Sequence, residues 1–108
     1  MEPRLLAPLI DLYLEQKQTE KAMILLKELE GSPVRQIKVR AKLNIGNLLF
    51  DQKEYDLALQ KYEEIIGQYA FSGLVLEALT KIIDCSEKLG LQEKRKRYYS
   101  ILHDFFES

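Results

Sequence analysis

The feature that most constrains the fold of this chain is a helical pattern that occurs twice. Apolar and small residues in the middle of the chain recur 36 positions earlier, so that Ile45, Leu49, Ala58 and Tyr62 correspond to Leu9, Tyr13, Ala22 and Leu26. Their spacing of four residues is that of one face of a helix. Because Gly46 and Ala58 are small, two antiparallel helices can approach closely there. The pattern therefore predicts pairs of helices that repeat along the chain.

The same periodicity and the turn residues divide the chain into helices. We expect helices over about 4–16, 19–30, 35–52 and 55–68, a further one across the apolar residues of 76–83, and a last one near 91–106. Gly31-Ser32-Pro33 ends the second helix. Pro8 falls inside the first, where it removes a hydrogen bond. The sequence predicts either a frayed or kinked start there, or a helix that begins near Pro8.

Residues 39–72 resemble one repeat of the tetratricopeptide (TPR) family, whose pattern reads W-x2-L-G-x2-Y…A-x3-F…P. Lys42 takes the Trp place, Ile45-Gly46 the L-G place, Leu49 the Tyr place, and Ala58-x3-Tyr62 the A-x3-F place. The resemblance implies an all-α fold, namely a right-handed superhelical stack of three antiparallel helix pairs (a TPR-like α-solenoid). One domain of residues 1–108 would hold repeats at about 3–38, 39–72 and 73–106. Arg95 stands where Ala22 and Ala58 stand in the other repeats, so close helix packing is not expected there unless the arginine stem extends outward.

A subgroup of the family is suggested by the link between the second and third repeats. Residues 62–79, YEEIIGQYAFSGLVLEAL, are similar to the link of bacterial TPR proteins of the envelope-assembly and Tol–Pal accessory type. Ala70 stands where those proteins carry Pro. The closing residues 102–108 are similar to the beginning of the same link.

Charge and hydropathy exclude several classes of function. Sixteen basic and seventeen acidic residues give a net charge of -1, so there is no overall attraction to nucleic acid or to a membrane surface. No apolar run of 18 residues is present, so no membrane span is expected. The N-terminus lacks the pattern of a signal peptide. We expect a cytoplasmic protein, or a periplasmic one if the domain comes from a longer exported chain.

The sequence carries no motif for catalysis, a cofactor or a metal. There is no phosphate-binding loop, and Cys85 and His103 are the only residues of their types, too few for a zinc site. The basic run Lys94–Arg97 points in four directions on a helix, which favours a solvated face over a nucleic-acid site. No enzyme activity and no nucleic-acid partner are expected.

The family resemblance also implies which residues face a concave groove. The main groove positions are Arg40, Leu43, Asn44, Asn47, Phe50, Lys81 and Asp84, and the first repeat adds Asp11 and Leu14 to the same face. Asn44 and Lys81 match two positions of the carboxylate clamp of chaperone-binding TPR domains, but Asp11 and Glu77 stand at other clamp positions and would repel a carboxylate. We expect Asn47 to bond a ligand backbone while Leu43 and Phe50 hold an apolar side chain. The alternative is that Leu43 and Phe50 only pack between helices.

The last predicted helix has an apolar arc of about 160°, wider than the stripe that burial of one face requires. The residues of this arc are Tyr98, Tyr99, Ile101, Leu102, Phe105 and Phe106. Either Ile101 with Phe105 or Tyr99 with Phe106 should be exposed, as an interface for a further repeat or for a second copy of the chain. Alternatively, the rings fold back onto Ile82 and Leu89.

Taken together, these observations predict a non-catalytic scaffold that binds a segment of a protein or peptide partner in the concave groove. A module for self-association, or for assembly within a larger TPR protein, is the alternative. A nucleic-acid-binding helical domain has only the run Lys94–Arg97 in its favour.

Overall fold

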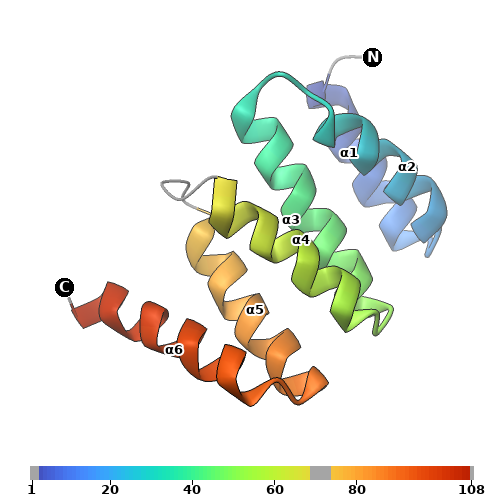
Figure 1. Ribbon diagram of the computed structural model, residues 1–108. Helices are drawn as coiled ribbons and strands as arrows, with labels where there is room; N and C mark the ends of the chain where they lie inside the picture. The colour runs from blue at the N-terminus through green and yellow to red at the C-terminus, as the bar shows by residue number, and fades with distance from the viewer. Residues whose placement is uncertain (1–2, 69–73, 108) are drawn as a thin grey trace.

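The computed structural model describes residues 3–68 and 74–107, and every regular element in these two ranges is an α-helix (Figure 1). The helices are α1 (Pro3–Glu15), α2 (Thr19–Glu30), α3 (Arg35–Asp51), α4 (Tyr55–Gln68), α5 (Val75–Leu89) and α6 (Gln92–Glu107). Each helix packs against the next one in sequence, which gives a layered body of 41 × 27 × 18 Å. The hairpin α1–α2 lies at one end of the stack and α6 at the other.

The predicted helices lie close to the observed ones, and the structure decides between the two alternatives left open at Pro8. The structure shows α1 as one continuous helix from Pro3 to Glu15 with Pro8 inside it, so no later start is seen. Helix α3 begins at Arg35, as predicted for the helix over 35–52, although the second repeat was expected to start at residue 39. Of the segment 62–79 that suggested the bacterial subgroup, residues 69–73, with Ala70, lie outside the described residues.

Each of the three hairpins turns in the same way. Lys17, Lys53 and Gly90 have φ angles of 58°, 64° and 72°, in the left-handed region. The residue after each donates its backbone N–H to a carbonyl five residues back: Gln18 to Tyr13 at 2.7 Å, Glu54 to Leu49 at 2.9 Å and Leu91 to Ser86 at 2.8 Å. This is the Schellman arrangement at a helix C-terminus, for which glycine is the usual residue. The shared turn fixes the correspondence between hairpins, at an offset of 36 and then of 37 residues.

The core consists of two clusters of buried residues, one on each side of α3. The first contains Ile10, Ala22, Leu26, Leu29, Ala41, Ile45 and Leu48, and the second contains Val39, Leu43, Ala58, Leu59, Tyr62, Ile65, Ala78, Ile82 and Cys85. The predicted close approach occurs at Gly46, where an added Cβ would lie 2.6 Å from Cε1 of Tyr62. Ala22 and Ala58 are fully buried, whereas Arg95 is exposed. The small residues therefore set the spacing of the first two hairpins.

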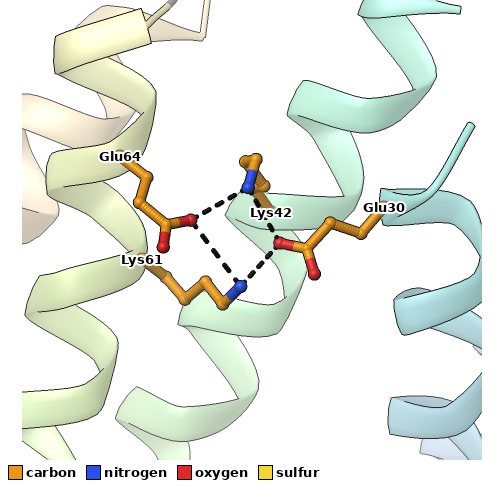
Figure 2. Close-up of polar contacts among 4 residues, drawn as sticks. All are labelled: Glu30, Lys42, Lys61 and Glu64. Atoms are coloured by element: carbon orange, nitrogen blue, oxygen red, sulfur yellow. Dashed lines mark hydrogen bonds and ion pairs between the residues drawn. The ribbon is translucent and has the colours of Figure 1, made fainter. Parts of the chain in front are cut away.

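Four charged side chains connect the first two hairpins (Figure 2). Lys42 of α3 places its Nζ 3.0 Å from Glu30 Oε2 and 2.9 Å from Glu64 Oε2. Lys61 of α4 places its Nζ 2.6 Å from the same Glu30 oxygen and 3.6 Å from Glu64 Oε2. Each carboxylate thus has two ammonium partners, and the network spans α2, α3 and α4. A lysine in the Trp place of the repeat pattern serves here as the centre of an ion-pair network.

Candidate functional site

A cavity of about 750 Å³ lies between α1 and α3, next to the turns of the first two hairpins. Its size is in the range of pockets that enclose a ligand. The buried side chains of Ile10, Leu26 and Leu48 belong to the lining, and Leu14 of α1 adds an apolar side chain that is 37% exposed. The cavity therefore combines a firm apolar base with one accessible apolar side chain.

Two predicted groove residues, Asn44 and Asn47, line this cavity. They lie three residues apart on α3 and so on one face of the helix. Asn47 Oδ1 accepts a 2.6 Å hydrogen bond from the hydroxyl of Tyr62, which fixes the side-chain amide. The hydroxyl is protonated at neutral pH, and burial raises the pKa of Tyr62 further above its ordinary value. Among the described residues the Asn47 NH₂ group has no hydrogen-bond acceptor, so its two N–H donors are available.

Of the charged residues that line the cavity, Asp11 was expected on the concave face of the first repeat, whereas Lys17 and Asp51 were not predicted. Asp11 of α1, Asp51 at the end of α3 and Lys17 in the first turn all line it, and all three are exposed. Within residues 3–68 and 74–107, neither aspartate forms an ion pair. Two free carboxylates against one ammonium group make the rim acidic. An acidic rim is electrostatically suited to a basic side chain and not to a carboxylate.

Leu43 and Phe50 pack between helices instead. Leu43 is 2% exposed within the second core cluster, so the expectation that it contacts a ligand is corrected: it lies on the face of α3 that meets α4 and α5. The half-buried ring of Phe50 packs edge-on against Tyr55, with centroids 5.1 Å apart, and Lys81 Nζ lies 4.8 Å from its centroid. Neither side chain lines the cavity.

The remaining predicted groove residues lie apart from the cavity. Arg40 is exposed, while Lys81 and Asp84 of α5 are half-buried; none of the three lines it. The structure thus brings Asn44 and Asn47 together with residues of α1, and not with the predicted residues of α5.

Cys85 and His103 were considered as candidates for catalysis or metal binding. Cys85 is fully buried, and burial, with the nearby Asp84 carboxylate, raises the pKa of its thiol to about 11. His103 is exposed on α6. No group of three or more His, Cys, Asp or Glu side chains within the described ranges could hold a metal ion. None of the helices described there is long and apolar enough to cross a membrane.

The apolar arc of α6 is divided between contact and exposure. Tyr98 packs against the second core cluster and donates its hydroxyl to Glu63 Oε2 at 3.0 Å, and Leu102 is half-buried. Four residues are exposed, namely Tyr99 at 54%, Ile101 at 45%, Phe105 at 56% and Phe106 at 73%. Tyr98 therefore agrees with the alternative in which the rings fold back onto the core. The four exposed residues agree with the expectation of an exposed apolar surface on this helix.

The basic run of α6 is partly occupied within the molecule. Lys94 Nζ lies 3.1 Å from Glu63 Oε1, and the Arg97 guanidinium lies 5.4 Å from the centroid of the Tyr98 ring. Only Arg95 and Lys96 of the run are left in solvent without such a partner among the described residues. The four side chains do not form one basic stripe.

Comparison with known proteins identifies the fold. No family model matches the sequence, and no curated protein matches it significantly. Among solved structures, the TPR domain of FLU from Arabidopsis superposes with a TM-score of 0.78 at 24% sequence identity, covering 97% of this chain and 94% of that one. The chain therefore has the fold of a TPR domain, all-α with six helices in the described residues packed in sequence. TPR domains are generally protein-interaction modules and typically non-catalytic.

Proposed function

We propose that this chain is a non-catalytic interaction module that binds a segment of another protein in the cavity between α1 and α3, on the concave side of the stack. One observation carries this proposal. Two carboxamides, two carboxylates without ion-pair partners and an accessible leucine converge on one cavity of a TPR fold. Such a preformed site needs little ordering of the receptor on binding.

The chemistry of the cavity indicates the ligand. Asn44 and the free NH₂ of Asn47 can bond the backbone of an extended segment, since a carboxamide offers donors and acceptors of the kind that a peptide group needs. Leu14 offers apolar contact to one side chain. Asp11 and Asp51 favour a lysine or arginine beside it. We therefore infer a basic, partly apolar segment as the ligand.

Selection from a random peptide display library tests the proposal without a known partner. The selected peptides should be enriched in Lys and Arg. Asn44→Ala should weaken their binding about fivefold, the equivalent of about 1 kcal/mol for one hydrogen bond. Asp51→Asn should weaken it about two- to fivefold, more at low salt. Asp56→Asn, at an exposed aspartate of α4 outside the cavity, is the matched control and should change nothing.

Two outcomes would contradict the proposal: no peptide enriched above background, or Asn44→Ala and Asp51→Asn binding as the parent does. Asn44 serves this test better than Asn47, because Asn47→Ala would leave the buried Tyr62 hydroxyl without its acceptor. Loss of binding in that variant could then reflect loss of folding.

The compartment and the source of the partner rest on the resemblance alone. The similarity of residues 62–79 to bacterial envelope-assembly and Tol–Pal accessory proteins favours a periplasmic location if the domain belongs to a longer exported chain, and a cytoplasmic one otherwise. Because the structural likeness to FLU shows the fold only, this assignment stays a prediction.

A further inference from the structure

The third hairpin lacks the close contact that organises the second. With Gly90 aligned to Lys53, residues of the third hairpin lie 37 positions after their counterparts. Gly46 then corresponds to Ile83, Ala58 to Arg95 and Tyr62 to Tyr99. In the second hairpin, the glycine leaves room for the tyrosine ring, and Tyr62 is fully buried. In the third, the buried Ile83 occupies that room.

The consequence is an aromatic pair on the outer side of α6. Tyr99 is 54% exposed although its counterpart Tyr62 is buried, and Phe106 is 73% exposed. These two residues are seven positions apart, so at about 100° per residue they differ by only about 20° around the helix. Helix α6 lies at the end of the stack formed by the described helices (Figure 1). An exposed pair of rings on such a face marks an interaction surface.

A further hairpin stacked in the same register does not fit this surface. The surface of the second hairpin that packs against α5 contains Leu43, Ala58 and Leu59, which are all buried. The corresponding residues of the third hairpin are Thr80, Arg95 and Lys96, all exposed. A helix packed there as α5 packs on the second hairpin would bury two unpaired cations, which is strongly unfavourable. The same argument excludes head-to-tail packing of α1 from a second copy.

We propose that the outer face of α6 pairs with α6 of a second copy of this chain, antiparallel about a two-fold axis level with residues 100 and 101. In this register Arg95 lies opposite Phe106 of the second copy, and Tyr99 lies opposite Leu102 of the second copy. Each cation thus covers an aromatic face instead of being buried alone. The same patch serves both copies, so the interface closes at a dimer.

Charge decides the direction of the pair. Helix α6 has Glu93 and four consecutive cations, Lys94–Arg97, in its first half, and Asp104 and Glu107 in its second. Antiparallel pairing places the centres of the two basic runs about 15 Å apart along the axis, at 1.5 Å per residue. Parallel pairing would bring them to the interaxial distance of about 8–10 Å. The Debye length is about 8 Å at physiological ionic strength. Salt therefore screens the repulsion between the two basic runs far better at the larger separation of the antiparallel pair.

The cavity between α1 and α3 remains free in this dimer, because it lies at the opposite end of the stack from α6. Each dimer would present two peptide-binding sites. A partner with two basic segments would then bind more tightly than either segment alone.

Sedimentation velocity from low micromolar to submillimolar concentration tests the proposal. The parent chain should shift from monomer to dimer and form nothing larger. Tyr99→Glu and Phe106→Glu should each raise the dimer dissociation constant by about tenfold or more, as expected for a central aromatic contact. Ile101→Glu is the matched control: Ile101 is 45% exposed but lies about 160° away from Tyr99 around the helix, and this variant should dimerise as the parent does.

Phe106 is the safest position for this test, because its side chain is mostly exposed and near the end of the helix. Circular dichroism should show an unchanged helical signal for all three variants. A parent that stays monomeric throughout would overturn the proposal. So would assembly that continues past the dimer, or an Ile101→Glu effect as large as that of Tyr99→Glu.

Discussion

Gly46→Ala tests the contact that sets the spacing of the second hairpin. The added Cβ would lie 2.6 Å from Cε1 of Tyr62 and 3.0 Å from both Cδ1 and Cζ. Contacts of 2.6 Å do not occur between unbonded carbon atoms, so something must shift. The Tyr62 ring cannot move easily, because it is fully buried and its hydroxyl is bonded to Asn47 at 2.6 Å. The helices themselves must therefore separate.

Two opposing effects determine the magnitude. Overpacking a filled core costs about 1–3 kcal/mol. Alanine is better than glycine in a helix by about 1 kcal/mol, which offsets part of this. Because a rigid ring is the obstacle, we expect the upper half of the packing cost and a net loss of about 1–2 kcal/mol. For a domain near this size, each kcal/mol lowers the melting temperature by about 4–8 °C.

The assay is urea unfolding followed by circular dichroism, with Gly67→Ala as the matched control. Gly67 lies in α4, and a Cβ there would meet no atom within 4 Å. The same substitution should therefore stabilise the chain by up to about 1 kcal/mol. Opposite signs for the two variants are the expected result. A Gly46→Ala variant as stable as the parent would refute the packing argument and the register of the hairpin with it.

Two further predictions concern the turns and the buried tyrosine. Lys53→Gly should raise the free energy of unfolding by about 1 kcal/mol, since a left-handed residue with a Cβ costs about 1–2 kcal/mol, less the entropy that glycine gains in the unfolded chain. The matched change Gly90→Ala, at a φ of 72°, should lower the same quantity in urea titrations, and two shifts of the same sign would be inconsistent with this. Tyr62→Phe removes only the hydroxyl bonded to Asn47 and should cost about 1 kcal/mol in thermal melting; an unchanged melting temperature would show that this bond contributes nothing.

The sequence predicted the fold well because the signals for helices and for close packing are local. The second helix was expected over 19–30 and is observed over Thr19–Glu30. Gly46 and Ala58 were expected at the helix crossing, and both are buried there. The course of α1 through Pro8 was left open by the sequence. A proline costs about 3 kcal/mol in a helix. Packing of α1 against α2 and α3 must offset this cost, and the local sequence pattern does not show that packing.

The candidate site was less predictable, because a face of α3 can meet either solvent or another helix. Asn44 and Asn47 were assigned to the groove and line the cavity, but Leu43 was assigned there too and is buried. Helical periodicity predicts on which face of the helix a side chain lies. It does not predict whether that face meets solvent or another helix. Lys17 and Asp51 were missed because they enter the cavity through the hairpin turn and the helix end, where the repeat pattern specifies no residue.

Acid titration tests the ion-pair network, which no sequence pattern indicated. Burial alone would raise the pKa of Glu30, but the hydrogen bonds from Lys61 and Lys42 outweigh it and lower the pKa from 4.5. A carboxyl whose pKa is lower in the folded state stabilises the protein at pH values above its unfolded pKa. That contribution is lost as the pH falls through the folded pKa. The network should therefore stabilise the chain at neutral pH and cease to do so well below pH 4.5.

Glu30→Gln isolates this contribution, because other acid-sensitive groups remain in both proteins. At neutral pH the variant should be less stable than the parent by about 1 kcal/mol, the upper range for exposed ion pairs, since Glu30 has two partners and is 20% exposed. In urea titrations at successively lower pH, the two stabilities should converge below pH 4.5, while high salt should narrow the gap at neutral pH. Parallel stability curves across the acid range would mean that Glu30 titrates alike in the folded and unfolded chains. The charge of Glu30 would then contribute nothing to the free energy of unfolding, although the four side chains lie close together.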